Sequence, residues 1–480
     1  MLFRRFYDDA LAQASYLIGC QRTGDAIVVD PNRDVEQYLT AAKAEGARIA
    51  HVTETHIHAD FVSGARELAH RTGAQLSLSD EGPPEWRYGF ADADGVRLLR
   101  DGDSIEVGDI RLDVIHTPGH TPEHVSFVVT DTAGANEPMG ILSGDFLFVG
   151  DVGRPDLLER VAGERGSAES LARQMFGSLR RISALPDWLQ VWPGHGAGSA
   201  CGKVLGAVPQ STLGYERRFG WAFGIDDEEE FLTAALDGLT DPPRSFARMK
   251  RINRDGPAIL GETRALPRLD AAALAARRAE GAVAVDTRST AEFSREHLVG
   301  AIAIPAGASV LKWTGSLLDG DQKIALIAND EPTARRIALQ LAMIGFEQVV
   351  GFALPEAARE LAGREGAQRV ERVSPRELAR RMETDEPYVL DVRAVHEWAA
   401  GHLPGVPNLP LASLPDRLEE IPRDQPIVLQ CQSGTRSIIA ASILQAAGFE
   451  NVADLETGYK GWVAAGLPVQ RGATAGSPVG

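Results

Sequence analysis

The sequence predicts an α/β protein of about three domains, because strands and helices alternate in its first half and its second half contains a repeat. The chain has 480 residues, too many for a single hydrophobic core. Residues 14–30 form two strand-like runs around a Thr23-Gly24-Asp25 turn, followed by an amphipathic stretch at 35–45 and an apolar run at 49–52. This order is typical of a layered α/β domain.

The second half contains two related segments with a period of about 100 residues. Residues 285–288, Glu292, His297 and 345–346 recur as 390–393, Glu397, His402 and 448–449. This period is too long for a solenoid and suits two copies of a small α/β domain. We therefore expect domains at 1–245, 258–365 and 368–475. Asp241-Pro242-Pro243 ends the first domain, and a basic linker from Arg244 to Arg254 should lead to the second.

Composition excludes several classes of partner. A net charge of −18 disfavours nucleic acid and anionic membrane surfaces, since both attract clustered Lys and Arg. No apolar run is long enough to span a membrane, and the start of the chain lacks the apolar segment of a secretory signal. Three cysteines are too few for a disulfide framework, so we expect a cytoplasmic protein. A homo-oligomer is the default expectation for such an enzyme.

Four short motifs carry residues that bind metals. The run His56-Ile57-His58-Ala59-Asp60 places three such side chains at alternating positions of an extended segment. The other motifs end apolar runs and contain glycine, which permits close backbone approach; they are His116 to Pro122, Ser143 to Asp145, and Trp192 to Gly196. In this order, the four motifs resemble the metallo-β-lactamase superfamily, which implies an αββα sandwich for the first domain.

The same resemblance gives significance to Phe61, because the superfamily usually has a histidine there that helps to hold a second metal. The motifs look most like the persulfide dioxygenase branch, which implies His56, His120 and Asp145 as ligands of one Fe(II) per chain. Two histidines and one carboxylate leave open positions for O₂ chemistry. His58 could complete a three-histidine zinc site, so zinc remains an alternative. We expect His58, Asp60 and His195 to line the pocket or to orient the ligands.

Two further residues near these motifs are candidates for roles in the reaction. Arg154, in a Gly-Arg-x-Asp element, also resembles the persulfide dioxygenases, in which the arginine lies near the thiol substrate. Its alternative role is a structural salt bridge to Asp151 or Asp156. Cys201 follows His195 by six residues. It is a candidate sulfur relay or, alternatively, a small buried residue in a glycine-rich turn.

The second repeat contains a cysteine loop between an apolar strand and a helical run. Its backbone N–H groups, the helix dipole and Arg436 should favour a thiolate at Cys431. The C-x₄-R spacing suits a single sulfur atom, whereas cysteine phosphatases use C-x₅-R. With Asp391, Arg393 and His402 upstream, this copy resembles a rhodanese, which implies Cys431 as the nucleophile. The same resemblance implies that the loop binds substrate through Gln432, Ser433, Gly434, Thr435, Arg436 and Ser437. The first copy has Ala328 in place of the cysteine and is expected to be inactive.

The whole chain resembles a persulfide dioxygenase–rhodanese fusion. This implies oxidation of a low-molecular-weight persulfide to sulfite with Fe(II) and O₂, followed by sulfur transfer from Cys431 to sulfite, which gives thiosulfate. Two alternatives remain. One is a zinc thioester hydrolase of the glyoxalase II kind joined to a sulfurtransferase. The other is a non-catalytic sulfur carrier. The sequence does not identify the thiol that carries the persulfide.

Overall fold

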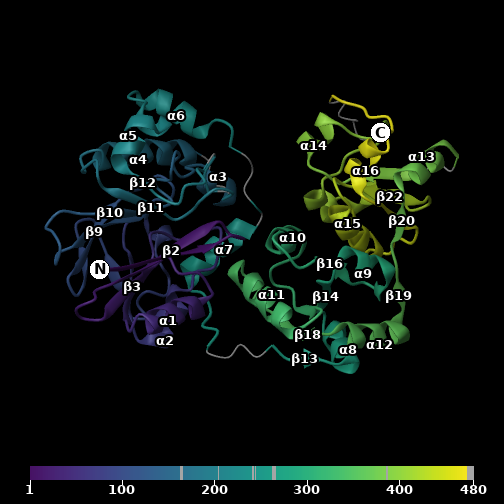
Figure 1. Cartoon of the computed structure of the whole chain (residues 1–480), viewed down its shortest axis with the longest axis horizontal. Helices are drawn as coiled ribbons and strands as arrows, with labels where there is room; N and C mark the ends of the chain where they lie inside the picture. Colours follow the sequence, from purple (N-terminus) through teal and green to yellow (C-terminus); the bar gives the residue numbers. More distant parts are fainter. Residues whose placement is uncertain are drawn as a thin grey trace. The chain divides into compact units, whose positions relative to one another are not determined.

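The computed structural model describes residues 1–162, 166–199, 201–203, 205–239, 243, 245–261, 266–384 and 387–472. Asp241, Pro242, Arg244 and the expected domain end at residue 475 lie outside these ranges. The chain divides into two compact units (Figure 1). One comprises Met1–Arg264 with Leu341–Gly345, and the other comprises Ala265–Gln340 with Phe346–Gly480.

The first unit contains two six-stranded sheets. The order of the first sheet follows the chain: β1 (Leu2–Asp8), β2 (Gln13–Gly19), β3 (Asp25–Val29), β4 (Arg48–Thr53), β5 (Gln75–Ser79) and β6 (Arg97–Leu99). The second sheet runs in the reverse order: β12 (Ser211–Thr212), β11 (Gln190–Pro193), β10 (Gly140–Gly144), β9 (Val125–Asp131), β8 (Ile110–His116) and β7 (Ser104–Val107).

Strand β2 shows why the two sheets pack face to face. Successive strand side chains point to opposite faces. Tyr16 and Ile18 accordingly join an apolar cluster with residues of β8 and β9 in the other sheet. Leu17 points the opposite way, into a cluster with Val35 and Leu68 from the helices. Because both faces of β2 are covered, all seven of its residues are buried. This is the expected αββα sandwich.

Helices cover the outer face of each sheet (Figure 1). Helices α1 (Val35–Ala44) and α2 (Ala65–Thr72) pack on the first sheet. On the second sheet, α4 (Ser167–Ile182) and α6 (Glu228–Leu236) bury Met175, Leu179 and Phe231. The remaining helical segments of the unit are η1 (Pro84–Trp86), α3 (Leu157–Ala162), α5 (Leu213–Phe219), η2 (Trp221–Phe223) and α7 (Ser245–Asp255). The sequence predicts a linker from Arg244 to Arg254, and this is wrong, because helix α7 occupies Ser245–Asp255 and buries one of its faces.

The second unit contains the two repeats as parallel sheets with the same strand order. The first sheet is β13 (Arg268–Leu269), β18 (Val349–Ala353), β17 (Ile324–Ile327), β14 (Val283–Asp286) and β16 (Ile302–Ala303). The second is β20 (Glu371–Val373), β23 (Val452–Leu455), β22 (Ile427–Gln430) and β21 (Tyr388–Asp391). A small sheet pairs β15 (His297–Leu298) with β19 (Ala367–Gln368).

The helices of the first repeat are α8 (Ala271–Ala279), α9 (Thr290–Arg295), α10 (Val310–Leu317), α11 (Glu331–Met343) and α12 (Pro355–Glu365). Those of the second are α13 (Pro375–Thr384), α14 (Val395–Ala400), η3 (Leu411–Asp416), η4 (Leu418–Glu420), α15 (Thr435–Ala446) and α16 (Gly458–Ala464). Every residue of α15 from Ser437 to Gln445 is buried. The first repeat contributes to this burial, since the Ala303 N–H donates to Ser442 Oγ at 3.0 Å.

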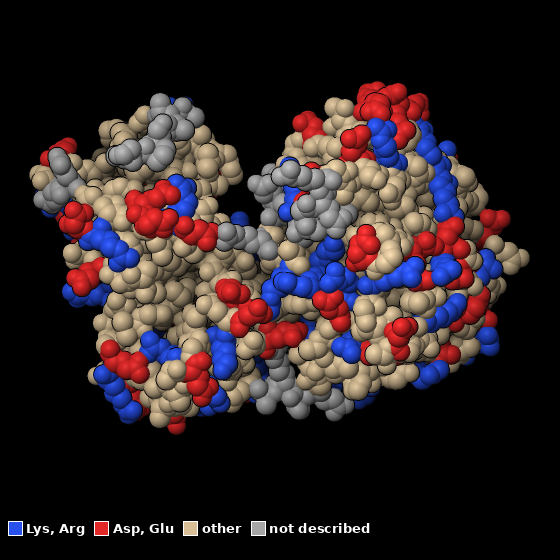
Figure 2. All heavy atoms as spheres, turned by 180° about the vertical axis from the view of Figure 1, so that it is seen from behind, with Lys and Arg blue, Asp and Glu red and all other residues tan. Residues whose placement is uncertain are grey.

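The surface carries both signs of charge. Acidic and basic side chains lie close together on the face shown in Figure 2. Many form ion pairs, such as Arg173 with Glu169 and Glu228. No helix among the described residues is long and apolar enough to span a membrane.

Candidate metal centre and cysteine loop

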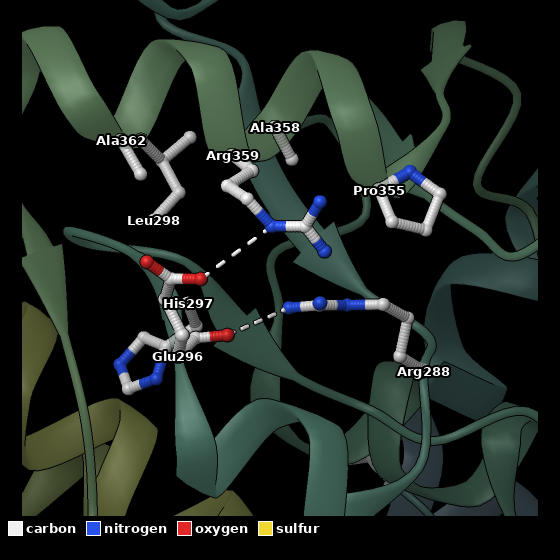
Figure 3. Close-up of a pocket in the computed structure, with 8 residues that line it drawn as sticks. All are labelled: Arg288, Glu296, His297, Leu298, Pro355, Ala358, Arg359 and Ala362. Atoms are coloured by element: carbon white, nitrogen blue, oxygen red, sulfur yellow. Dashed lines mark hydrogen bonds and ion pairs between the residues drawn. The ribbon is translucent and has the colours of Figure 1, made fainter.

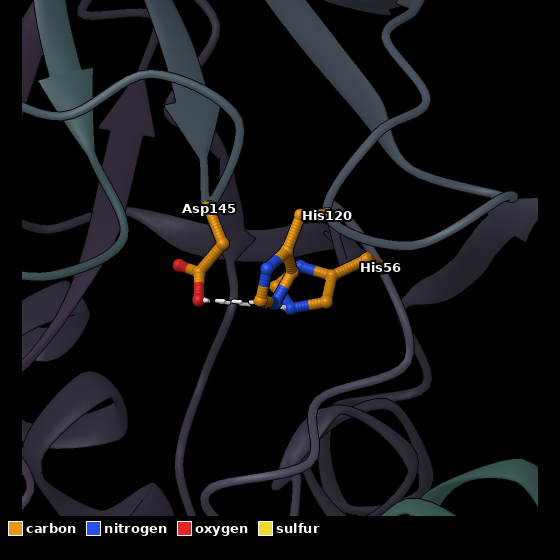
Figure 4. A group of neighbouring side chains, drawn as sticks. All are labelled: His56, His120 and Asp145. Atoms are coloured by element: carbon orange, nitrogen blue, oxygen red, sulfur yellow. Dashed lines mark ion pairs between the residues drawn. The ribbon is translucent and has the colours of Figure 1, made fainter. Parts of the chain in front are cut away.

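Three predicted ligands come together at the ends of separate segments of the sandwich (Figure 4). His56, His120 and Asp145 are buried, and one ligand atom of each lies within 4.8 Å of the other two. Asp145 Oδ2 lies 3.5 Å from His120 Nε2 and 3.9 Å from His56 Nε2. Two histidines and one carboxylate form a donor set that occurs both in non-haem iron centres and in catalytic zinc centres.

Each ligand is held by a hydrogen bond on the side away from this point. His56 Nδ1 lies 3.0 Å from Thr55 Oγ1, whose hydrogen goes to Asp30 Oδ2. His56 therefore donates from Nδ1 and keeps its Nε2 lone pair. His120 Nδ1 donates to the Arg154 carbonyl at 3.1 Å, so His120 also keeps the lone pair on its Nε2. His56 Nε2 and Asp145 Oδ2 are buried without a hydrogen-bond partner, so the residues present fit a divalent metal ion.

Burial also sets the protonation state of the two histidines. It holds the pKa of His56 well below the usual range, and the neighbouring His58 adds to this effect. Burial likewise lowers the pKa of His120, although the Asp145 carboxylate opposes it. Both imidazoles are therefore neutral near pH 7, the form that binds a metal.

Glycine allows the backbone to approach Asp145 closely. At Gly194, a Cβ atom would lie 2.6 Å from Asp145 Oδ1, closer than real Cβ contacts permit. At Gly144, which has a φ of +50°, a Cβ would lie 2.5 Å from Thr55 Oγ1. Larger residues at these positions would push the ligand segments apart.

His195 connects two carboxylates instead of facing the other ligands. Its Nδ1 is 2.8 Å from Asp145 Oδ1, and its Nε2 is 2.7 Å from Asp60 Oδ2. Burial opposes a charge on His195, but these carboxylates outweigh burial and raise its pKa well above the usual range. The protonated ring donates at both nitrogens, so in this arrangement neither nitrogen is available as a ligand.

The His58 ring lies beside the ring of the ligand His56, with centroids 4.2 Å apart. His58 Nε2 lies 3.2 Å from Asp30 Oδ1, and the ring centroids of His58 and Phe61 are 4.3 Å apart. Burial lowers the pKa of His58, but Asp30 outweighs this effect and raises it to about 9. Phe61 is fully buried and offers no ligand atom. His58 is engaged by Asp30 and does not belong to the three-donor cluster.

Sequence reasoning missed Asn253, which fixes the histidine segment. Its side-chain amide donates to the carbonyls of His58 and Phe61, both at 2.7 Å, and its oxygen accepts from the Ser63 N–H at 2.9 Å. Asn253 lies on α7, where Phe246, Met249 and Asn253 are buried. This i, i+3, i+7 spacing of buried positions was the available signal for a helix.

Arg154 and Cys201 lie beside the ligands. Arg154 forms a bidentate salt bridge with Asp156, at 2.9 and 2.8 Å, which is the structural alternative considered for it. Cys201 is buried and forms a second group of potential metal ligands with Asp60 and His195. Burial raises the pKa of the Cys201 thiol well above the usual range, and the Asp60 and Asp145 carboxylates add to this effect. The thiol is therefore protonated near pH 7.

Cys431 lies at the end of β22, before α15. Its Sγ accepts a hydrogen bond from the Gly434 N–H at 3.1 Å and from the Ser437 hydroxyl at 3.4 Å. The start of α16 is hydrogen-bonded to the loop, since the Tyr459 N–H donates to the Cys431 carbonyl at 2.7 Å. The sulfur thus faces the N-terminal end of a buried helix, where negative charge is stabilised.

The side chains of the loop differ in position. Arg436 pairs with Glu397 through two contacts, at 2.6 and 2.8 Å, and no hydrogen bond joins it to Cys431. Gln432 accepts from Arg393 at 3.2 Å. Ser433 and Thr435 are exposed. The Arg436 guanidinium is therefore held beside the loop by Glu397, from where it adds positive charge.

The first repeat keeps the framework of this site without its chemistry. Asp286 and Arg288 pair as Asp391 and Arg393 do, and His297 stacks on Phe293 as His402 stacks on Trp398. The pocket beside Arg288 in Figure 3 has a volume of about 10 Å³, enough for a single water molecule. Its lining residues are Arg288, Glu296, His297, Leu298, Pro355, Ala358, Arg359 and Ala362. It is too small for a thiol substrate.

Family comparisons agree with this architecture. Residues 8–195 match the metallo-beta-lactamase superfamily, and residues 270–352 and 374–465 each match the rhodanese-like domain. The chain belongs to the metallo-beta-lactamase superfamily and carries two rhodanese-like domains. The predicted fold class is confirmed, and the fold implies a divalent-metal site.

Individual relatives have different activities. Over 226 residues the chain is 33% identical to a hydroxyacylglutathione hydrolase of Pseudomonas entomophila (47% of this chain, 78% of the relative). Over 199 residues it is 27% identical to the mitochondrial persulfide dioxygenase ETHE1 of Bos taurus (41% and 68%). A crystal structure of a metallo-beta-lactamase from Staphylococcus aureus subsp. aureus COL is 42% identical, with a TM-score of 0.65, and covers 74% of this chain and 99% of its own. The chain covers only 60% and 59% of the length of two other relatives.

Proposed function

We propose that the chain oxidises a low-molecular-weight persulfide to sulfite and then converts sulfite to thiosulfate. The first reaction consumes RSSH, O₂ and water and yields RSH, sulfite and protons. A single Fe(II) ion held by His56, His120 and Asp145 would supply the open coordination positions that O₂ chemistry requires. The persulfide dioxygenase among the relatives supports this assignment.

The observation that carries the proposal is the arrangement of free and occupied ligand atoms. His56 Nε2 and Asp145 Oδ2 have no hydrogen-bond partner, while both nitrogens of His195 are hydrogen-bonded to carboxylates. Phe61 removes the histidine with which the superfamily usually holds a second metal, so the donor set suits one ion. Asp30, through Thr55, and the Arg154 carbonyl keep the two imidazoles in the required tautomer.

In the second reaction, a persulfide on Cys431 gives its outer sulfur to sulfite. A second persulfide molecule supplies that sulfur: the Cys431 thiolate bonds to its outer sulfur, the S–S bond to the carrier breaks, and RSH leaves. Sulfite then forms a bond to the outer sulfur, the bond from that sulfur to Cys431 Sγ breaks, and the products are thiosulfate and the Cys431 thiolate. The Gly434 N–H and Ser437 hydroxyl stabilise that thiolate as it leaves. Joining both sites in one chain raises the effective concentration of sulfite for Cys431.

The competing proposal is a zinc thioester hydrolase, which the hydroxyacylglutathione hydrolase relatives favour. Product analysis separates the two functions. Iron-loaded protein given glutathione persulfide and O₂ should form thiosulfate, and Cys431→Ser should accumulate sulfite with little thiosulfate beyond the uncatalysed reaction. Hydrolysis of a thioester by zinc-loaded protein, with no sulfur oxidation by the iron form, would support the hydrolase instead. An iron-loaded protein with neither activity would indicate a sulfur carrier.

A further inference from the structure

The first compact unit includes five residues that come from the sequence of the first repeat. They are Leu341–Gly345, which form the end of α11 and the turn after it. All five are buried. The Val62 N–H donates to the Met343 carbonyl at 2.6 Å, and Arg248 Nη1 on α7 donates to the Gly345 carbonyl. The function proposed above gives this turn no role.

The turn contacts the segment that follows the ligand His56. Asn253 of α7 binds the Phe61 carbonyl and the Ser63 N–H. The turn binds the N–H of Val62, which lies between them. Phe61 and Val62 are both fully buried. Because a buried backbone N–H group requires a partner, the turn and Asn253 together determine the path of this segment.

Helix α7 holds the turn as well as the histidine segment. Arg248 and Ile252 are four residues apart on α7, so they share a face of the helix. Gly345 packs against this face, because a Cβ atom there would lie 2.9 Å from Arg248 Nη1 and 3.0 Å from Ile252 Cδ1. Gly345 has a φ of +82°, which favours glycine. The turn, α7 and the histidine segment therefore contact one another in pairs.

The second repeat provides an internal comparison. After α15, residues 446–448 (Ala-Ala-Gly) correspond in sequence to residues 343–345 (Met-Ile-Gly), and both turns end in a glycine with positive φ. The first and last residues of the turn after α15 are exposed, and a Cβ at Gly448 would come no closer than 3.9 Å to another part of the chain. Met343 and Ile344 are only 3% and 5% exposed. The larger side chains thus occur in the turn that is covered.

We propose that the first repeat supports the metal centre, with Leu341–Gly345 as a positioning element for the segment that carries His56. A ligand binds its metal well only when the surrounding residues hold it within about 0.5 Å of the required position. The turn contributes by fixing Val62, six residues after His56. The inference rests on the metal position proposed above, and it gives the first repeat a role that requires no nucleophile.

Two variants disturb the turn by different routes. Gly345→Val places a side chain against α7 and strains the left-handed backbone, so the turn should move away from Val62. Its matched control is Gly281→Val, because Gly281 also lies two residues after a helix, has a φ of +88° and has open space at its Cβ position. Arg248→Met removes the hydrogen bond to the Gly345 carbonyl. Arg251→Met, at an exposed position of α7, is its control.

Two measurements on the full chain test the proposal without turnover. Hydrogen exchange of the metal-free protein should be about tenfold faster at peptides containing Val62 in Gly345→Val and Arg248→Met, and unchanged in both controls. The visible absorption spectrum of the Co²⁺-loaded protein depends on the geometry of the ligands. It should change in the same two variants only, and their affinity for Co²⁺ should fall about tenfold.

Unchanged exchange in Gly345→Val and Arg248→Met would overturn the proposal, and so would faster exchange that leaves the Co²⁺ spectrum and affinity as in the wild type. An equal effect in Gly281→Val would indicate general destabilisation and would also overturn it. If Gly345→Val does not fold, Arg248→Met and its control decide the question. A wild type that binds no Co²⁺ contradicts the metal centre itself, whereas a chain that binds Co²⁺ but oxidises no persulfide leaves this inference standing.

Discussion

One oxygen of the Asp145 carboxylate is hydrogen-bonded to His195, and the other faces the histidines His56 and His120. His195 Nδ1 donates to Asp145 Oδ1 at 2.8 Å, so Oδ2 is the oxygen that faces His56 and His120. His195 is in turn fixed by Asp60 at 2.7 Å. This chain of hydrogen bonds orients Oδ2 of the carboxylate toward His56 and His120, where the proposed metal ion would bind.

The first prediction concerns the ligands. His56→Ala should lower the iron content of purified, iron-reconstituted protein by at least about tenfold, since two of three donors cannot hold the ion at comparable affinity. The exposed His70 supplies a matched control, and His70→Ala should bind as much iron as the wild type. Elemental analysis measures both. Full iron occupancy in His56→Ala would remove His56 from the ligand set.

The second prediction concerns Phe61. Phe61→His should raise metal binding from one ion per chain toward two under excess Zn²⁺, because it adds a nitrogen donor near Asp60. The substitution also removes apolar volume from a fully buried position, so we expect a loss of about 1–3 kcal/mol in the free energy of unfolding. Phe61→Leu loses volume without adding a donor and should still bind one ion. Two ions per chain in the wild type would contradict the mononuclear site.

The third prediction concerns α7. Asn253→Ala leaves the carbonyls of His58 and Phe61 and the Ser63 N–H without their partner. We expect a loss of about 1–3 kcal/mol and weaker iron binding, because the histidine segment is no longer fixed. The control is Arg251→Ala, on an exposed position of the same helix. Titration of iron into both variants checks this, and equal affinities would show that α7 does not support the site.

The fourth prediction concerns stability and pH. Asp454 is a fully buried carboxyl on β23, and burial raises its pKa from 3.8 to about 7. Between these values the folded state therefore binds a proton that the unfolded state has lost. The contribution of Asp454 to stability should therefore fall as pH rises through this range, by at most roughly 4 kcal/mol. Asp454→Asn lacks this dependence and should become more stable relative to the wild type between pH 4 and pH 8.

Urea denaturation at pH 4, 6 and 8 measures this difference, and hydrogen exchange of peptides from β22 and β23 identifies the relevant transition. Glu456→Gln, two residues along the chain, is the control and should retain most of the wild-type pH dependence. A stability difference that is constant with pH would show that Asp454 titrates normally.

The sequence predicted the features that depend on local pattern. The ligand motifs end apolar runs, and the repeat is visible because Asp286 and Arg288 recur as Asp391 and Arg393. It did not predict partners that are distant in the chain. Asn253 lies about 190 residues from the segment it fixes, and its basic surroundings suggested a linker. The pairing of Arg436 with Glu397 and the pairing of Arg372 with Asp454 likewise depend on tertiary packing.

The central claim is tested most directly by O₂ uptake of anaerobically purified, Fe(II)-loaded protein on addition of glutathione persulfide, with sulfite and thiosulfate quantified at the end. We predict that one O₂ is consumed per persulfide sulfur oxidised, and that His120→Ala abolishes uptake while His70→Ala does not. No O₂ consumption by a fully iron-loaded protein, together with thioester turnover by the zinc form, would contradict the account and identify the first domain as a hydrolase.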